Sequence, residues 1–292
     1  MRVEEHVPLA RFTTLGTGGP ARWFSRPESV EELQELLRWA RDEHAAVETI
    51  GLGSNVLVHD DGVDALVVKL AGELGSVQVD GDVLTAGGGA ANAVCLHRAR
   101  AAGLGGFEFA SAIPGTTGGG VRMNAGAYGK AFRDVLLEAL VVDADGATTM
   151  PAEQLDLSYR HSALGPGQVV ARVRIRLESR EPTEIKQTVA DLLAQRKATQ
   201  PTNKRTFGSV FKNPDGDRGA GRLIEECGLK GHRIGGALIS PRHANFIENA
   251  GGATSADALA LMTEARARVH ERFGIVLEHE VRLLGPLGLP PL

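Results

Sequence analysis

SAIPGTTGGGVRMNAGAYG, residues 111–129, is the stretch that decides the fold of this chain, and we call it the glycine loop. Six of its nineteen residues are glycine, against an average usage of about 7% in proteins. Glycine is needed where the backbone takes a positive φ angle or must approach another group without an intervening Cβ. The loop also carries Ile113, Val121, Met123 and Tyr128, and a solvated linker would not have this apolar content. It therefore predicts an ordered, partly buried loop that lies against a flat or anionic surface.

The composition around this loop is ordinary for a soluble globular protein, with 42% hydrophobic and 23% charged residues in a chain of 292. A net charge of −4 and an aromatic content of 4% argue against a nucleic-acid partner. No run approaches the ~18 apolar residues of a membrane span, and the first residues do not resemble a signal peptide. We therefore expect a cytoplasmic protein without a membrane partner.

The two cysteines, Cys95 and Cys227, each lie in an apolar helical pattern. Neither has a second Cys or a His at the spacing of metal ligands, so we expect buried, inert thiols and no metal site. Further motifs are missing from the sequence. The glycine loop is neither a dinucleotide-binding G-x-G-x-x-G unit nor a P-loop, and the chain has no H-E-x-x-H, C-x-x-C or G-x-S-x-G.

Helical and strand patterns alternate along the chain. We expect helices after Ser29 and at Ala90–Ala102, Pro182–Thr199, Ala220–Cys227 and Asp257–Phe273, and strands at Val47–Ile50, Val135–Val142, Val169–Leu177 and Ile275–Leu284. In Val169–Leu177, three arginines alternate with apolar residues, which predicts one buried and one charged face. Residues 200–218 are polar and broken by Pro and Gly, and they are the best candidate for a domain boundary.

Gly51-Leu52-Gly53-Ser54-Asn55 separates two apolar strand patterns. Such a turn can gather backbone N–H groups into an anion-binding nest, which would suit a diphosphate. A plain tight turn would use the same residue types, and the residues alone do not decide between the two interpretations.

Three polar segments could carry chemistry. Ser209, Lys212 and Asn213 lie between Gly208 and Pro214, where a loop could hold a serine as proton donor beside groups that bind an anion. Tyr159-Arg160 offers a guanidinium, and Glu278–Arg282 begins as a strand whose end could present a carboxylate as a general acid. The alternatives are an ordinary turn for the serine and solvated surface charges for the other two segments.

Taken together and in this order, these motifs resemble the UDP-N-acetylenolpyruvoylglucosamine reductase family. The resemblance covers nearly the whole chain, from Phe12-Thr13-Thr14 to Gly285, and includes GLGSNVLV, YRHS, GSVFKNP and LEHEVRLLG. The short connection around residues 159–161 and the segment RIGGALISPRHANFIEN are similar to the second type of this family, which lacks an extra loop over the substrate.

The resemblance implies an α+β flavoenzyme of peptidoglycan precursor synthesis. Hydride would pass from NADPH through non-covalently bound FAD to the enolpyruvyl group of a UDP-sugar, giving UDP-N-acetylmuramate. The implied fold is a vanillyl-alcohol-oxidase/PCMH-type FAD-binding domain in two halves, residues 1–70 with a strand from 281–292 and residues 71–199. A C-terminal α+β substrate-binding domain would span residues 200–280. We expect a monomer or weak oligomer whose partner is the UDP-sugar.

The resemblance also implies roles for individual residues. Ser209 would protonate the substrate carbon, Glu280 would assist beside it, and Arg160 would polarise the substrate carboxylate. The implied FAD-binding residues are Gly51, Gly53, Ser54, Asn55, Ile113, Pro114, Gly115, Thr116, Gly118, Asn124 and Gly126, largely through backbone N–H groups of the diphosphate-binding turns. The implied substrate-binding residues are Tyr128, Tyr159, Lys212 and Asn213.

The chain departs from the family pattern at Thr199, where members often carry a lysine. Lys197, Lys204 or Lys212 would have to replace that cation. Two other functions stay open at this point. One is an FAD-dependent oxidase of the same fold that acts on another sugar or alcohol, and the other is an inactive flavin-binding homologue.

Overall fold

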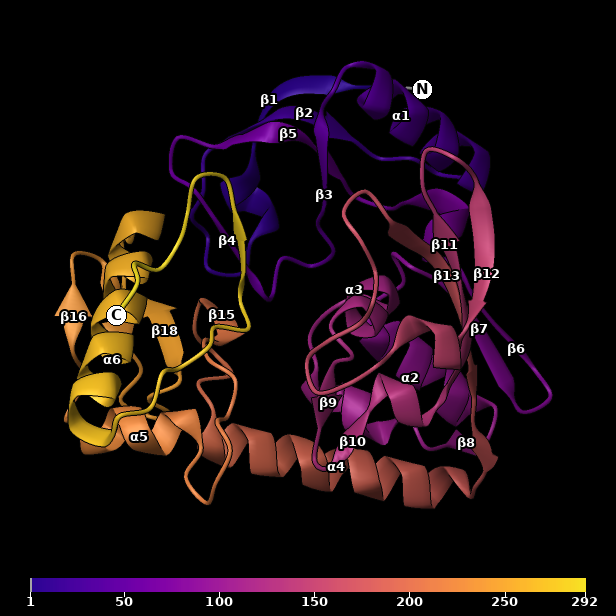
Figure 1. Ribbon diagram of the computed structural model, residues 1–292. Coiled ribbons are helices and arrows are strands. Elements are labelled where there is room, and N and C mark those ends of the chain that lie inside the picture. Colours follow the sequence, from indigo (N-terminus) through magenta and orange to yellow (C-terminus); the bar gives the residue numbers. More distant parts are fainter. Residues whose placement is uncertain (1) are drawn as a thin grey trace. The chain divides into compact units, whose positions relative to one another are not determined.

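The computed structural model describes residues 2–292, and the chain forms two compact units. Unit 1 comprises the residues up to Glu5, Trp23–Leu52 and Ala65–Arg196, and unit 2 comprises His6–Arg22, Gly53–Asp64 and Lys197–Leu292. Figure 1 shows the course of the chain through the elements of both units. The first sheet has the strand order β1-β2-β5-β3. Its strands are β1 (Glu4–Pro8), β2 (Pro20–Ser25), β3 (Ala46–Thr49) and β5 (Val63–Val68). The chain passes from one unit to the other within β1, β2 and β5.

Unit 1 is built on a five-stranded antiparallel sheet in the order β12-β11-β13-β7-β6. Its strands are β6 (Val77–Asp80), β7 (Val83–Gly87), β11 (Leu136–Val142), β12 (Ala147–Pro151) and β13 (Val169–Arg176). The alternation predicted for β13 is confirmed, because Val173 and Ile175 are buried while Arg172, Arg174 and Arg176 are exposed. Two short pairs complete the strands of this unit: β8 (Leu104–Gly105) with β14 (Glu178–Ser179), and β9 (Gly126–Ala127) with β10 (Lys130–Ala131).

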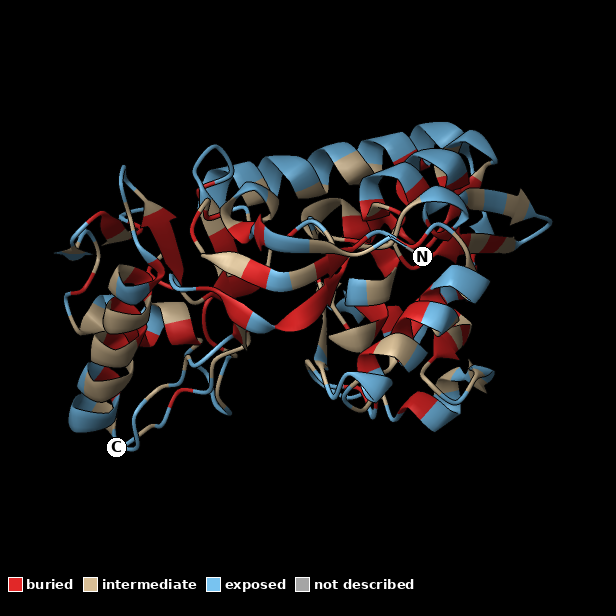
Figure 2. Cartoon of the chain, turned by 90° about the horizontal axis from the view of Figure 1, so that it is seen from above, coloured by how far each residue is buried: buried red, intermediate tan, exposed pale blue. Residues whose placement is uncertain are grey.

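The helices of unit 1 are α1 (Val30–Asp42), α2 (Asn92–Ala101), α3 (Thr117–Arg122) and most of α4 (Pro182–Thr199). Ser29 caps α1 as predicted, since its hydroxyl accepts a hydrogen bond from the N–H of Glu32 at 3.2 Å. Helix α4 has the predicted bounds, but Ile185 is the only residue that it buries within the described chain, and most of it is exposed (Figure 2).

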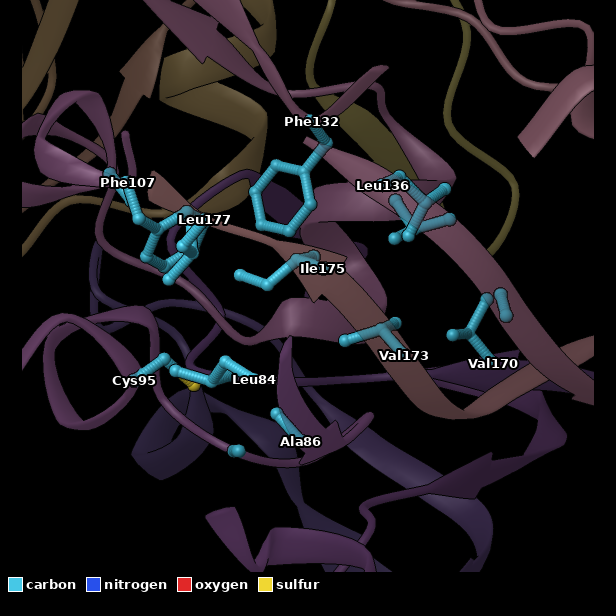
Figure 3. Close-up of a cluster of buried hydrophobic side chains, with 14 of the residues drawn as sticks. Leu84, Ala86, Cys95, Phe107, Phe132, Leu136, Val170, Val173, Ile175 and Leu177 are labelled. Atoms are coloured by element: carbon cyan, nitrogen blue, oxygen red, sulfur yellow. The ribbon is translucent and has the colours of Figure 1, made fainter. Parts of the chain in front are cut away.

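The core of unit 1 forms where α2 and the glycine loop cover the five-stranded sheet. Leu84, Val173 and Ile175 of the sheet lie in one buried cluster with Cys95 of α2 and Phe132, which Figure 3 shows in close-up. Phe132 packs edge-on against the rings of Phe107 and Phe109, which belong to the same cluster. This cluster gives the glycine loop a rigid support.

Unit 2 contains a four-stranded sheet in the order β15-β18-β17-β16, together with the parallel pair β19-β4. The strands are β15 (Thr206–Ser209), β16 (Arg233–Ile234), β17 (Ala237–Ile239), β18 (Phe246–Asn249), β19 (Arg282–Leu284) and β4 (Val56–Val58). Helices α5 (Ala220–Glu226) and α6 (Ser255–Phe273) accompany them, and α6 buries Leu261, Met262 and Val269 in the core of this unit.

Two local predictions in unit 2 were wrong. Glu278 and Glu280 do not lie on a strand, because the expected strand 275–284 is reduced to β19, and only His279 forms an isolated bridge, with Phe211. Ser209 does not lie in a loop either, since it is the last residue of β15 and pairs with Phe246. The partner of Ser209 lies 37 positions away (246 − 209), so no local pattern reveals that pairing, whereas the local alternation in residues 275–281 suggests a strand that the tertiary structure does not form.

Other features limit what the chain can do. Both cysteines are free thiols. Cys95 is buried as predicted, and burial raises its pKa to about 12, whereas Cys227 was predicted to be buried but is only partly so. Among residues 2–292, no group of three or more His, Cys, Asp or Glu side chains is arranged to hold a metal ion. No helix in the same range is both long enough and apolar enough to cross a membrane.

Candidate active site

The glycine loop is joined to the segment after β7 by main-chain hydrogen bonds within unit 1. The N–H groups of Thr117 and Gly118 donate to the carbonyl oxygens of Ala90 and Gly88, each at 2.9 Å. A Cβ on Gly118 would lie 2.8 Å from the Gly88 oxygen, so this approach requires glycine. The order predicted for this loop is therefore confirmed, and the N–H group of Gly118, which was expected to face the cofactor, is used inside the protein.

The N–H groups that remain in this part of the loop are those of Gly115 and Thr116, which donate to no other group within residues 2–292. Thr116 is the N-cap of α3, and its hydroxyl accepts a hydrogen bond from Gly119 N–H at 3.4 Å. These two N–H groups lie at the start of a helix, where the positive end of the helix dipole favours an anion.

Gly51, in the turn after β3, approaches the same loop. A Cβ at this position would lie 2.7 Å from the hydroxyl oxygen of Thr116. The ammonium group of Lys69 donates to the carbonyl oxygen of Gly51, and burial, with a smaller contribution from Arg26, lowers the pKa of Lys69. Lys69 was missed from the sequence, because a single lysine after an apolar strand looks like a surface charge.

Two buried polar atoms beside the glycine loop have no hydrogen-bond partner among the described residues. They are Oγ of Ser111 and Oδ1 of Asn92, whose amide nitrogen Nδ2 donates to the Ile113 carbonyl oxygen at 3.1 Å. Buried polar atoms in native proteins nearly always have partners. The groups of this part of the loop that fit a polar, anionic cofactor such as FAD are the unused N–H groups of Gly115 and Thr116.

Asn124 and Gly126 serve the structure of unit 1 in other ways. The amide of Asn124 is satisfied at both ends, because Nδ2 donates to Ser158 O at 2.7 Å and Oδ1 accepts from Arg133 N–H at 3.0 Å. The carbonyl oxygen of Gly126 accepts from the guanidinium of Arg160 at 3.1 Å. The sequence did not reveal the contacts with Ser158 and Arg160, since each joins residues 34 positions apart.

Arg160 is half-buried and has a φ angle of +55°, a left-handed conformation that costs free energy for a residue with a side chain. Its guanidinium carbon lies 5.2 Å from the ring centre of Tyr159, which is 53% exposed. Tyr128, also with a positive φ, donates its hydroxyl hydrogen to the Leu192 carbonyl of α4 at 3.0 Å. Unit 1 therefore holds Tyr128 and Arg160 in left-handed backbone conformations, with Tyr159 exposed beside the arginine.

In unit 2, the end of β15 lies beside the segment that carries Glu280. The N–H of Glu280 donates to Val210 O at 2.9 Å, and the N–H of Lys212 donates to Glu278 O at 2.8 Å. Ser209 and Glu280 thus belong to neighbouring segments, although they are 71 positions apart (280 − 209) in the sequence. The hydroxyl of Ser209 is half-buried, and no described residue forms a hydrogen bond with it.

Lys212 and Asn213 lie in the same segment, shortly after Ser209. Nζ of Lys212 lies 3.2 Å from a carboxylate oxygen of Glu278, so part of its charge is compensated. Oδ1 of Asn213 accepts from Ala220 N–H at 3.0 Å and so stabilises the start of α5.

The turn Gly53–Asn55 is tied to the Glu280 segment and to the N-terminal part of the chain, all within unit 2. Nδ2 of Asn55 donates to Glu280 O at 2.9 Å, and Thr14 N–H donates to Gly53 O at 3.0 Å. Gly53 has a φ of +66°, and a Cβ there would overlap the Phe12 carbonyl oxygen at 1.9 Å. The Asn55 side chain therefore holds the segment that carries Glu280, a contact that the sequence did not indicate.

Comparison with known proteins assigns both matched regions of the chain to one family. Residues 21–150 match the model of an FAD binding domain, and residues 200–284 match the C-terminal domain of UDP-N-acetylenolpyruvoylglucosamine reductase. The reductase of that name from Anaeromyxobacter dehalogenans (strain 2CP-C) is 47% identical over 96% of this chain and 86% of its own length. The chain belongs to the UDP-N-acetylenolpyruvoylglucosamine reductase family.

Two further members of this family support the assignment. UDP-N-acetylenolpyruvoylglucosamine reductase 2 from Symbiobacterium thermophilum is 44% identical over 97% of this chain and 92% of its own length. The crystal structure of the reductase from Thermus caldophilus superimposes with a TM-score of 0.85 at 40% identity, covering 97% of this chain and 99% of that one. The predicted fold class is confirmed, and the chain is an FAD-containing oxidoreductase of the reductase family.

Proposed function

We propose that this enzyme reduces the enolpyruvyl group of UDP-N-acetylglucosamine enolpyruvate to give UDP-N-acetylmuramate, with NADPH as the hydride donor. The reaction is a step of peptidoglycan precursor synthesis, in the cytoplasm. The observation that carries the proposal is the pair of neighbouring segments in unit 2 that present Ser209 and Glu280, in a chain that is 47% identical to a reductase of this name. Bound FAD supplies the hydride chemistry between nicotinamide and substrate.

Unit 1 contributes the cofactor loop. The unused N–H groups of Gly115 and Thr116 would hold the diphosphate of FAD, and Gly51 lets the turn after β3 approach the same loop. The turn Gly53–Asn55 of unit 2 offers further N–H groups. Lys69 holds the Gly51 carbonyl and so fixes the conformation of the first turn.

Arg160 binds the carboxylate of the substrate. Reduction of an enol ether beside a carboxylate builds negative charge on that carboxylate and on the adjoining carbon, and a guanidinium stabilises this charge through two parallel hydrogen bonds. The Gly126 carbonyl and the Tyr159 ring hold the guanidinium in place, so little rotamer freedom is lost when substrate binds.

Ser209 donates the proton that completes the reduction at the substrate carbon. A serine hydroxyl is a weak acid, so its proton must be replaced as it leaves, and the carboxyl of Glu280 is placed on the neighbouring segment to assist. Lys212, Asn213, Tyr128 and Tyr159 bind the UDP-sugar, with Lys212 offering a cation and Asn213 an amide N–H. Lys212 is also a candidate to replace the lysine that family members often carry at the position of Thr199.

We propose the domain division of residues 1–70 with 281–292, 71–199 and 200–280 as the functional one, with the last domain over the substrate. The protein would act as a monomer or weak oligomer. The matched regions, 21–150 for the FAD binding domain and 200–284 for the reductase C-terminal domain, support a change of role near residue 200.

The experiment that tests the proposal follows the flavin absorbance without oxygen. NADPH is added to the purified protein first, and UDP-N-acetylglucosamine enolpyruvate is added next. Bleaching by NADPH followed by full colour recovery with the UDP-sugar is the expected result. Recovery only on admission of air would instead identify an oxidase, and a lack of bleaching by NADPH would identify a different donor.

A further inference from the structure

The turn between β9 and β10 carries a tyrosine where the backbone disfavours one. Ala127 pairs with Lys130, so Tyr128 and Gly129 form a two-residue turn, with φ angles of +53° and +78°. Turns of this kind favour asparagine, aspartate or glycine, because a positive φ costs free energy for a larger side chain. Such backbone strain is typical of functional positions, where one side chain must be presented in a fixed direction.

The tyrosine side chain joins this turn to helix α4. Its hydroxyl donates to Leu192 O at 3.0 Å, and Figure 1 shows the β9-β10 pair beside the helix. In a continuous helix the same carbonyl accepts the backbone N–H of Arg196, four residues on, and the Arg196 side chain leans back over the turn that contains Leu192. Tyr128 and Arg196 are therefore neighbours on one face of α4.

The guanidinium of Arg196 is held partly out of water. The residue is half-buried, and burial lowers the pKa of Arg196, an effect that the neighbouring Tyr128 offsets in part. An arginine keeps its positive charge in spite of such a shift. Since water screens a half-buried charge less than an exposed one, Arg196 attracts an anion more strongly than an arginine on an open surface does.

A second arginine contacts the same hairpin, residues 126–131. Arg160 donates to Gly126 O at 3.1 Å, two residues before Tyr128, and all of these residues belong to unit 1. The hairpin thus has one guanidinium at its first strand and another beside its turn. Two separate cations at one short hairpin suit a ligand that carries two separate anionic groups.

The UDP-sugar of the proposed function is such a ligand, because it carries a carboxylate and a diphosphate, and Arg160 takes the carboxylate. On the basis of that function, we propose that Arg196 binds the diphosphate of a nucleotide substrate through paired N–H···O hydrogen bonds, with Tyr128 fixing the arginine beside the turn. NADPH carries a diphosphate as well, and the experiment below separates the two nucleotides.

The first test compares Arg196→Met with Lys186→Met, which removes the same charge from an exposed residue of α4 ten positions earlier (196 − 186). The oxidised holoenzymes are titrated by calorimetry with UDP-N-acetylmuramate and, separately, with UDP-N-acetylglucosamine. Arg196→Met should raise the Kd of both UDP-sugars about 10- to 100-fold, the effect of losing hydrogen bonds between charged groups. Lys186→Met should keep the native Kd values.

Arg196→Lys provides a second variant, which keeps the charge and serves even where the methionine variant does not fold. An ammonium lacks the paired donors of a guanidinium, so its Kd values should lie between those of Arg196→Met and the native protein. The ratio of Kd between Arg196→Met and the native protein should fall as the salt concentration rises from about 0.05 M to about 0.5 M, because salt screens the attraction between the guanidinium and the diphosphate.

Arg160→Ala separates the two anionic groups of the UDP-sugar. UDP-N-acetylglucosamine lacks the carboxylate, so Arg160→Ala should weaken only UDP-N-acetylmuramate, whereas Arg196→Met should weaken both to the same extent. NADP⁺ is titrated in parallel with each variant. A loss confined to the UDP-sugars assigns Arg196 to the sugar nucleotide, a loss confined to NADP⁺ assigns it to the nicotinamide nucleotide, and a loss of both assigns it to a subsite that the two share.

Native Kd values for both UDP-sugars and for NADP⁺ in Arg196→Met would overturn the proposal. A loss of affinity that salt leaves unchanged, or an equal loss in Lys186→Met, would overturn it as well, because the effect would then belong to the fold or to the net charge. A native enzyme that binds neither UDP-sugar would instead refute the proposed function, and the titration with NADP⁺ would still test Arg196.

Discussion

The glycine loop of unit 1 and the Ser209–Asn213 segment of unit 2 each carry residues predicted to act in the reaction, but they are held by different kinds of interaction. The glycine loop is held by main-chain donors and acceptors, at approaches that a Cβ would block at Gly51 and Gly118. The Ser209–Asn213 segment leaves its backbone in ordinary pairing and presents a hydroxyl, an ammonium and an amide. A cofactor site built from backbone needs shape, whereas a catalytic site needs particular functional groups. Substitutions in the two regions should therefore fail in different ways.

Ser209→Ala should give the largest effect, a lower rate of substrate reduction in a protein that folds normally. Loss of a positioned general acid lowers a rate by about 10²–10⁴. NADPH should bleach the flavin of the variant at nearly the native rate. Its colour should then recover with the UDP-sugar about 10²–10⁴ times more slowly than in the native protein. Stopped-flow absorbance measures both half-reactions. Equal slowing of the two would remove Ser209 from the proton-transfer step.

Arg160→Ala tests whether a side chain of unit 1 can also act in the chemistry. Loss of a group that stabilises developing negative charge costs about 10²–10³ in rate. The second half-reaction should slow by this factor while reduction by NADPH persists. Arg160→Lys provides the control, since it keeps the charge but not the two-pronged hydrogen bonding, and it should recover only part of the rate. An unchanged rate with substrate in Arg160→Ala would show that this arginine only holds Gly126.

Gly120→Ala should have the opposite outcome, a lower free energy of unfolding with the functional groups unchanged. A Cβ at Gly120 would lie 2.3 Å from the ring of Phe132, which is fully buried between Phe107 and Phe109. Overpacking of this kind costs about 1–3 kcal/mol. Gly119→Ala, one residue earlier in α3, meets only the Thr116 hydroxyl at 3.5 Å and should be neutral or slightly stabilising. Urea denaturation of the two apoproteins measures the difference, and equal stabilities would show that the loop yields to the added methyl group.

The same contrast explains what the sequence could and could not predict. Glycine at 115, 118, 119 and 120 was visible as a loop that must approach something closely, and helices such as α1 and α4 were visible from caps and spacing. Asn92 and Lys69 were not visible, because their importance depends on carbonyl groups that are distant in the sequence. Glu280 was recognised only through its family motif. Its structural support, from Val210 and Asn55, lies 70 and 225 positions away (280 − 210 and 280 − 55).

The smallest effect expected separates the stability of unit 2 from its chemistry. Asp257 closes a capping box at the start of α6, where Thr254 N–H and Gly236 N–H donate to its carboxylate at 3.0 and 3.1 Å. These hydrogen bonds hold the pKa of Asp257 below its ordinary value. Because the pKa is lower in the folded state, the carboxylate stabilises the fold above the ordinary pKa, and this contribution is lost as the pH falls through the folded-state value.

Asp257→Ala should therefore reduce the free energy of unfolding by about 1 kcal/mol at pH 7, the usual value of a helix cap. The gap to the native protein should narrow as the pH falls from about 5 through and below the ordinary aspartate pKa of about 3.9, because the folded-state pKa is lower still. Asp257→Asn keeps the acceptor oxygen and should retain most of the stability while losing the pH dependence. Urea unfolding at several pH values measures all three proteins. A gap that stays constant down to pH 3 would show that the carboxylate charge contributes nothing. Colour recovery with the UDP-sugar should stay at the native rate in both variants, because the start of α6 supports the fold of unit 2 and touches none of the groups proposed to act on the substrate.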